Sequence, residues 1–517
     1  MSGPVGTCCV VLHTHLPWVA HAGTWPVGEE WLHQAWSSSY LPVADLLARL
    51  AAEGHRDLLT LGITPVLHAM LDDPYLLRAQ HTWLGYWQTR AVELSASGRF
   101  ADVAAGEHRR ATRALTSFDQ HWRNGGSPVL RGLADSGVVE ILGGPATHPF
   151  QPLLSDRLVV DAQLGVGLDD QALRLGARPR GIWAPECGYR PGLESSYADA
   201  GVGHFLVDGP TLLASARSDA LATGAGWRVG GTDVVAFGRD LDVTYRVWSP
   251  RSGYPGGRWY RDFHHYDHPT GIRPFRVTGR RVADHEKKPY DAAAAAAAVR
   301  VDAADFVDVV RRRLVDIAAR RGRTGLVVVG YDTELFGHWW LEGPEWLEAV
   351  LRLLPAAGVR LSTLAGAVDA GHADDSVDLQ PGSWGSGKDW RVWDGAAVRD
   401  LVEESRDAQL RLLELVDKTV AARPGQRIAA LDQLAREAFL LTSSDWSFMV
   451  TKDSAAGYAR SRHAAHLARF NEIAALLSAR RDDAADRVAA RWRSVDGPFG
   501  HLDARRLQRR NATIDAR

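Results

Sequence analysis

The chain has 517 residues, of which 45% are hydrophobic and 24% are charged, and this composition excludes a disordered or fibrous protein. Its 60 Lys and Arg residues balance 62 Asp and Glu residues, so no overall positive field would attract nucleic acid. The length exceeds that of one compact core, and we expect several structural units.

Cysteine and tryptophan contents narrow the class of protein further. Only three cysteines are present, which is too few for a disulfide framework, and a reducing compartment fits best. The N-terminal segment has no basic region, and no apolar run approaches ~18 residues. The sequence therefore predicts a cytoplasmic protein without a membrane segment. Its 19 Trp residues supply flat surfaces suited to stacking on sugars or bases, and the balanced charge favours a sugar.

Short apolar runs recur along the first two thirds of the chain. Continuous runs of this kind are typical of strands that are buried on both faces of a parallel sheet. They begin at Cys8, Leu58, Val138, Arg180, His204, Asp233 and Gly325. We predict an α/β fold in which these seven strands form a (β/α) barrel, with an extra strand from Val359. A doubly wound open sheet is the alternative.

Helical patterns divide the rest of the chain. We assign residues 1–188 and 230–380 to the barrel, with a helical insertion at 68–130 that is too long for a simple crossover. A further helix is expected from Asp291, because this stretch has Asp near its start and Arg in its final turns, which matches the helix dipole. From residue 381 the apolar strand patterns disappear and amphipathic helical stretches follow, which predicts a C-terminal all-α domain over 381–517.

Two histidines, His13 and His15, end the first predicted strand. Residues two apart on a strand share a face, so both imidazoles can point into one cavity. The pair could bind a metal ion, donate hydrogen bonds to substrate hydroxyls, or be a buried structural pair.

Acidic residues follow two other predicted strands. Glu186 comes after the fourth strand and Asp332 after the seventh, where a barrel presents its active site. Glu334 lies two residues further on, but the chain is expected to turn there, and Asp332 is the better candidate. A pair of carboxyl groups can cleave a glycosidic bond with retention at a separation of about 5–5.5 Å, or with inversion at roughly 6.5–9.5 Å. A Glu held in a structural ion pair is the alternative for Glu186.

Six motifs of this chain resemble those of glycoside hydrolase family 57, and within that family the likeness is greatest to 1,4-α-glucan branching enzymes. The resemblance extends from residue 8 to about residue 470. The motifs are LHTHLPW from Leu12, EILGGPATHPFQPLL from Glu140, IWAPECGYRPGLE from Ile182, YRVWSPRSGYPG from Tyr245, YDTELFGHWWLEGPEWL from Tyr331 and SWGSGKDWRVWD from Ser383.

The resemblance implies a seven-stranded barrel, a small inserted subdomain with a gating loop at 189–229, and a helical domain that contributes to the cleft. It implies an α-1,4-glucan substrate such as glycogen, no cofactor and no metal ion. Glu186 would be the nucleophile and Asp332 the general acid/base of a retaining reaction. The expected sugar-binding residues are His13, His15, His148, Trp248, Trp384, Trp390, Trp393, Asp445 and Trp446.

One departure from the family keeps other activities open. Branching enzymes of this family carry an aromatic residue at the tip of the gating loop, but the segment Gly209–Trp227 has no Tyr and only Trp227 at its end. Hydrolysis of α-glucan or 4-α-glucanotransfer could use the same site. More distant alternatives are a metal-dependent carbohydrate deacetylase and a glucan-binding protein without activity. The sequence leaves the oligomeric state open.

Overall fold

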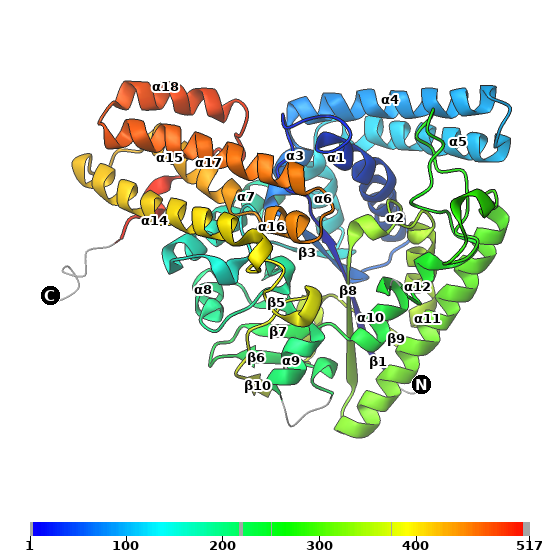
Figure 1. Cartoon of the computed structure of the whole chain (residues 1–517). Coiled ribbons are helices and arrows are strands. Elements are labelled where there is room, and N and C mark those ends of the chain that lie inside the picture. The colour runs from blue at the N-terminus through cyan, green and yellow to red at the C-terminus, as the bar shows by residue number, and fades with distance from the viewer. Residues whose placement is uncertain (1–3, 217–220, 250, 374, 510–517) are drawn as a thin grey trace.

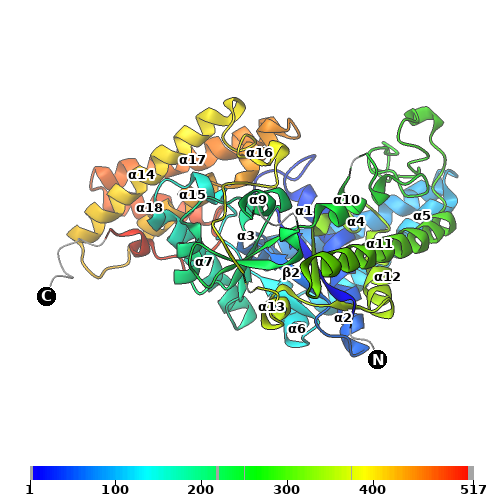
Figure 2. The same ribbon diagram turned by 90° about the horizontal axis from the view of Figure 1, so that it is seen from below.

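The computed structural model of the chain describes residues 4–216, 221–249, 251–373 and 375–509. It shows a mixed α/β fold with a C-terminal helical region, α14–α18. Two views at 90° place this region on one side of the central strands and helices α4, α5 and α11 on the other (Figures 1 and 2).

The central strands form two sheets. All pairings in the first sheet are parallel, and it contains β1 (Gly6–Thr14), β2 (Leu59–Ile63), β3 (Val139–Leu142), β8 (Gly325–Asp332) and β9 (Val359–Leu361). The second contains β4 (Gly181–Ile182), β5 (His204–Val207), β6 (Gly226–Val229), β7 (Val235–Gly238) and β10 (Asp375–Val377), and β6 runs antiparallel to β7. Each apolar run of the sequence forms a strand, including the extra run from Val359, whereas β6 and β10 were not predicted.

Backbone contacts join the two sheets at two places. A parallel bridge between Gly143 and Ile182 connects β3 to β4, which are edge strands of their sheets. At the other edge of the first sheet, the amide of Asp240, beyond β7, donates to the carbonyl of Val328 in β8 at 2.8 Å. Parallel pairing brings the carboxyl ends of the strands to one end of the fold, where His13 in β1 lies directly beside Asp332 in β8.

Helices cover the strands and extend from them. The longest in the described ranges, α11, begins after Asp291, where the sequence predicts a helix, and the Asp291 carboxylate caps it by accepting from the amides of Ala293 and Ala294. No helix in the described ranges combines the length and the apolar character needed to cross a membrane. The helices before residue 381 are α1 (Glu29–Ala35), α2 (Leu41–Ala52), α3 (Pro65–Leu71), α4 (Pro74–Ala96), α5 (Ala101–Ser117), α6 (Gly126–Asp135), α7 (Arg157–Leu175), α8 (Leu193–Asp199), α9 (Gly209–Ser215), α10 (Leu241–Trp248), α11 (Ala292–Arg321), α12 (Gly343–Ala356) and α13 (Leu364–Asp369).

Residues 189–229 do not form a unit apart from the sheets. Strand β5 lies within this range and is hydrogen-bonded to β4 and β7, so the range supplies a central strand. Trp227 is in β6, only 8% exposed, and its indole N–H donates to the carbonyl of Ala222 at 2.8 Å. It therefore packs in the core and is not at a loop tip. Residues 217–220 of the expected gating loop lie outside the described residues.

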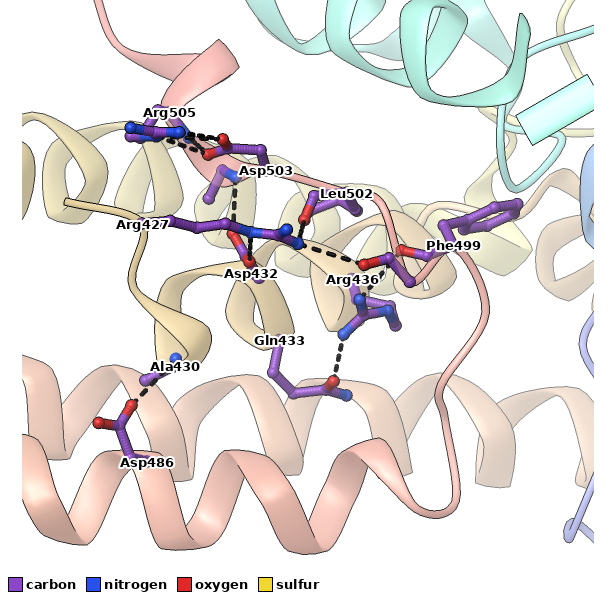
Figure 3. Close-up of polar contacts among 12 residues, drawn as sticks. Arg427, Ala430, Asp432, Gln433, Arg436, Asp486, Phe499, Leu502, Asp503 and Arg505 are labelled. Carbon is purple, nitrogen blue, oxygen red and sulfur yellow. Dashed lines mark hydrogen bonds and ion pairs between the residues drawn. The ribbon is translucent and has the colours of Figure 1, made fainter. Parts of the chain in front are cut away.

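The C-terminal helices pack around α15, in which every residue from Ala430 to Leu441 is buried. Its Arg436 is also buried and donates to the carbonyls of Pro498 at 2.5 Å and Phe499 at 3.2 Å (Figure 3). These backbone acceptors satisfy hydrogen-bond donors of the buried guanidinium. These contacts fix the terminal segment against α15. The helices of this region are α14 (Arg399–Ala422), α15 (Ala429–Leu441), α16 (Ser444–Thr451), α17 (Ala456–Ser478) and α18 (Asp482–Arg493).

Candidate active site

A cavity of about 420 Å³ opens at the carboxyl ends of β1, β4 and β8. Residues of the C-terminal helical region form part of its wall. Of the candidate residues from the sequence, it brings together His13, His15, His148, Glu186, Trp248, Asp332, Glu334, Trp384 and Asp445.

Glu186 lies in a tight turn after β4 and has a left-handed backbone conformation, with φ of 61°. Its side chain is 7% exposed, and both carboxylate oxygens accept hydrogen bonds. Trp384 Nε1 donates to Oε2 and Ser444 Oγ donates to Oε1, each at 2.7 Å. Burial and the nearby charge of Asp445 raise the pKa of Glu186 to about 7, although these two donors oppose the shift. The site thus holds a carboxyl group that ionises near neutral pH.

Asp332 ends β8 and is partly exposed to the cavity. Burial, followed by the charges of Glu334 and Glu186, raises its pKa well above the usual range. Glu334 is buried, accepts from the hydroxyl of Tyr40 at 2.5 Å and from the amide of His15 at 3.3 Å, and burial raises its pKa to about 7. With Glu186 and Asp445, the cavity therefore holds four carboxyl groups, whereas the sequence favoured two as the catalytic pair.

A chain of hydrogen bonds leads from the histidines to Glu186. His13 Nε2 lies 3.1 Å from His148 Nε2, and His148 Nδ1 lies 3.0 Å from Ser444 Oγ. Burial lowers the pKa of both imidazoles well below the usual value, so they are neutral. Because the Ser444 hydroxyl donates to Glu186, it accepts from His148 Nδ1, and His13 then donates to His148. Each hydrogen bond of this series is therefore donated in the direction of the Glu186 carboxylate.

His15 is paired with Asp445, which comes from α16. His15 Nε2 and Asp445 Oδ2 are 2.9 Å apart. Burial opposes protonation of His15, but Asp445 outweighs it and raises the pKa of the imidazole. Burial likewise opposes ionisation of Asp445, yet His15 lowers the pKa of this carboxyl to about 2. The ligand atoms of His15, His148 and Asp445 all lie within 4.8 Å of one another, so this cluster has a donor set that could hold a metal ion.

A buried ionic group supports Trp384. The guanidinium of Arg239 lies 4.9 Å above its indole ring. Arg239 and Lys388 both pair with Asp208, which is fully buried, at 2.7 and 2.6 Å. This arrangement fixes the indole whose N–H binds Glu186. Sequence reasoning did not identify Asp208, Arg239 or Lys388, although each is adjacent to a recognised motif or strand end.

Other aromatic side chains extend the cavity wall. Trp248 lines the cavity, and its ring centre lies 6.0 Å from that of Trp339, which is 37% exposed. Trp31, Tyr245 and Phe448 complete the aromatic part of the lining. The sequence analysis did not name Trp339 as a site residue, although it lies in the same motif as Asp332 and could have been identified from that position.

Three tryptophans expected in the cleft do not line this cavity. Trp393 is buried and stacks on Phe150 with ring centres 4.5 Å apart, and Trp390 packs against the edge of the same ring. Trp446 is buried in the helical region, where its indole N–H donates to the carbonyl of Leu440 at 2.9 Å. Trp393 and Trp446 are thus buried core residues, whereas Trp390 is half-buried beside Phe150.

Comparison with known sequences identifies the family of this chain. The profile of Glycosyl hydrolase family 57 matches residues 9–375, and that of the 1,4-alpha-glucan branching enzyme C-terminal region matches residues 404–506. A probable 1,4-alpha-glucan branching enzyme of Mycobacterium tuberculosis is 54% identical, with 97% of this chain and 98% of the relative covered. The 1,4-alpha-glucan branching enzyme of Thermococcus kodakarensis is 32% identical, with 91% and 73% covered.

Solved structures agree over nearly the whole chain. The crystal structure of the Thermococcus branching enzyme in complex with glucose and additives has a TM-score of 0.93 at 30% identity, covering 98% of this chain and 97% of that one. The α-amylase AmyC of Thermotoga maritima has a TM-score of 0.87 at 26% identity, covering 98% and 99%. The chain belongs to glycosyl hydrolase family 57.

Proposed function

We propose that this protein is a 1,4-α-glucan branching enzyme that acts by a retaining double displacement, with Glu186 as the nucleophile and Asp332 as the general acid/base. One asymmetry carries the assignment. Two donors, Trp384 and Ser444, stabilise the ionised form of Glu186. Within the described part of the chain, no hydrogen-bond donor reaches the carboxyl group of Asp332, whose pKa burial raises. Glu186 is thus suited to attack as an anion and Asp332 to hold a proton.

The proposed reaction has two steps. Glu186 attacks C1 of a glucose unit in an α-1,4 chain while Asp332 protonates the departing O4, which leaves a glucosyl ester on Glu186. Asp332 then removes the proton from the 6-hydroxyl of an acceptor glucan, whose oxygen displaces Glu186 and forms an α-1,6 branch. The two inversions at C1 retain its configuration.

The surrounding residues fit a glucan substrate. His13, His15 and His148 would bind hydroxyls of the reacting glucose, and Trp248 and Trp384 would stack on neighbouring units. We also propose that β1–β5, β7 and β8 form a (β/α)7 barrel. Residues 381–517 would be the helical domain that completes the cleft, because Ser444 donates a hydrogen bond to Glu186 and Asp445 lines the cavity. All three cysteines are buried and free, which is consistent with an intracellular location.

Incubation of purified protein with linear amylose tests the proposal. We expect new α-1,6 linkages, detected by proton NMR and by isoamylase digestion, with few new reducing ends. The Glu186→Gln variant should lose this activity while keeping its fold by circular dichroism. Unchanged amylose with the wild-type protein, or full activity in the variant, would contradict the proposal.

Hydrolysis of α-glucan is the second candidate, since the similar AmyC structure is that of an α-amylase. Trp227 is buried in β6 and cannot shield a covalent intermediate from water. Hydrolysis would release one reducing end for each bond cleaved and make no α-1,6 linkage. A ladder of linear oligosaccharides without new branches would instead indicate 4-α-glucanotransfer.

A further inference from the structure

A second cavity lies beside the candidate active site, between helices α4 and α5, the segment 261–273 and the connection from β8 to α12. Figure 1 shows the green segment that contains residues 261–273 against the outer ends of α4 and α5. An ion pair of Arg99 with Asp267 at 2.7 Å, and another between Arg261 and Glu107, hold the segment to these helices. The walls are therefore fixed by contacts outside the catalytic cavity.

Trp339 connects this second cavity to the active site, because its side chain lines both. Its backbone amide donates to the carbonyl of Glu334 at 3.0 Å, so the turn that presents the catalytic carboxyl groups also positions this indole. On the active-site side Trp248 is next to it, and on the other side the second cavity begins. The aromatic wall therefore continues from one cavity into the other.

The second cavity offers aromatic faces together with unused hydrogen-bond donors. The guanidinium of Arg90 lines the cavity, lies 4.9 Å from the centre of the Trp83 ring and makes no hydrogen bond within the described part of the chain. Arg261 also lines the cavity, and its Nη1 donates to Glu107, which leaves Nη2 without a partner among the residues that the structure describes. Across the cavity, Tyr266 is 37% exposed. A ligand oxygen in the cavity would accept hydrogen bonds from these terminal guanidinium N–H groups.

We propose that this second cavity is a remote binding subsite for an α-glucan chain, which stacks on Trp83, Tyr266 and Trp339 and accepts hydrogen bonds from Arg90 and Arg261. The inference rests on the proposed function, and it adds a site away from the reacting bond. A chain that leaves the catalytic cavity along Trp339 enters this subsite directly. It would strengthen binding of long chains and leave short ones largely unaffected.

The aromatic faces of this cavity favour a sugar over a small inorganic anion as the ligand, although guanidinium groups outnumber carboxylates in its lining. Arg261 and Arg110 both pair with Glu107, Arg110 at 3.0 Å. Arg273 donates to the carbonyl of Phe263 and to the hydroxyl of Tyr266, each at 2.7 Å. The spare donors are terminal N–H groups of Arg90 and Arg261 beside aromatic rings, and this arrangement suits the hydroxyls of a pyranose whose flat face stacks on a ring.

Binding can be measured without turnover in the Glu186→Gln variant. We expect calorimetry with maltoheptaose to show about tenfold weaker binding when Arg90→Met or Tyr266→Ala is added, whereas the Kd of maltotriose changes less than twofold. Arg78→Ala and Tyr86→Ala are matched controls, because both residues are exposed on α4 outside the cavity. They should bind as the parent does. Maltoheptaose affinity equal in all five proteins, or saturable binding of inorganic phosphate in place of the sugar, would overturn the proposal.

Kinetics in the otherwise wild-type protein separate this inference from the proposed function. We expect Arg90→Met to raise the KM for amylose about fivefold, with a smaller change in kcat, while Arg78→Ala keeps both wild-type values. If the wild type forms α-1,6 linkages and Arg90→Met has wild-type kinetics, the subsite is refuted and the function stands. If the wild type forms none, the function fails, and the binding comparison still decides whether the subsite exists.

Discussion

Ser444 Oγ donates a hydrogen bond of 2.7 Å to Oε1 of Glu186, and the two residues are 258 positions apart in the sequence. Ser444 is the first residue of α16, and its own amide donates to the carbonyl of His148 at 3.0 Å. The helical region therefore contributes directly to the proposed nucleophile. This contact makes the region part of the active site and not only a support for it.

We expect Ser444→Ala to reduce kcat by about 10- to 100-fold, the value of a hydrogen bond to a charged group. Loss of the donor also removes an interaction that lowers the pKa of Glu186. The acidic limb of the pH profile should therefore move to higher pH. Ser447→Ala, on the same helix but outside the cavity, is the control. An unshifted limb in Ser444→Ala would argue against an ionised Glu186 as the nucleophile.

The pH dependence of kcat/KM should be bell-shaped. Glu186 must be ionised to attack, and its pKa is about 7, so activity falls tenfold per pH unit below that value. Asp332 must be protonated in the first step, so activity falls as the pH rises above its own raised pKa. Measurement of initial rates from pH 5 to 10 checks both limbs. A flat profile below pH 7 would show that another group is the nucleophile.

Glu334 and Asp332 should respond differently to removal of their charge. Asp332→Asn should lose about 10²- to 10⁴-fold in rate, as for loss of a general acid. The charge of Glu334 raises the pKa of Asp332, so Glu334→Gln should move the alkaline limb to lower pH. Tyr40→Phe removes a donor to Glu334 and should shift the titration of Glu334 upward. If Glu334→Gln is as inactive as Asp332→Asn, the assignment of the general acid/base to Asp332 alone would be wrong.

Much of this arrangement could be predicted from the sequence because strands buried on both faces leave continuous apolar runs. The ends of those runs located Glu186 and Asp332 at the end of the fold where the cavity opens. Strand β10 could not be found in this way, because Asp375–Val377 is short and carries two polar residues. Ser444 could not be found either, since only the packed helical region brings it to Glu186.

Tryptophan positions were harder to predict than the acids. Trp384 and Trp393 stand in one motif, but one indole binds Glu186 and the other stacks on Phe150. Sequence patterns do not distinguish a ring that faces a cavity from one that faces apolar side chains. The difference depends on whether the surrounding groups in space are polar, and that follows only from the tertiary fold.

The tryptophans should therefore separate into two groups when their N–H groups are removed. Trp384→Phe loses the donor to Glu186, so we expect about tenfold lower kcat and an acidic limb moved to higher pH. Trp446→Phe loses a buried bond to the carbonyl of Leu440, so we expect a free energy of unfolding lower by about 1–2 kcal/mol. Kinetics and urea unfolding of both variants check this. Equal effects on kcat would contradict the placement of Trp446 in the core.

The cluster of His15, His148 and Asp445 should respond to metal ions as an inhibitory site. Its ligand atoms lie within 4.8 Å of one another, but His15 already pairs with Asp445 and His148 with Ser444. We expect activity to survive dialysis against EDTA. Added Zn²⁺ would displace the proton from His15 and break its bond to Asp445, so inhibition should strengthen as pH rises. Asp445→Asn should weaken the affinity for Zn²⁺ measured by calorimetry. Loss of activity in EDTA that Zn²⁺ restores would instead favour a catalytic metal.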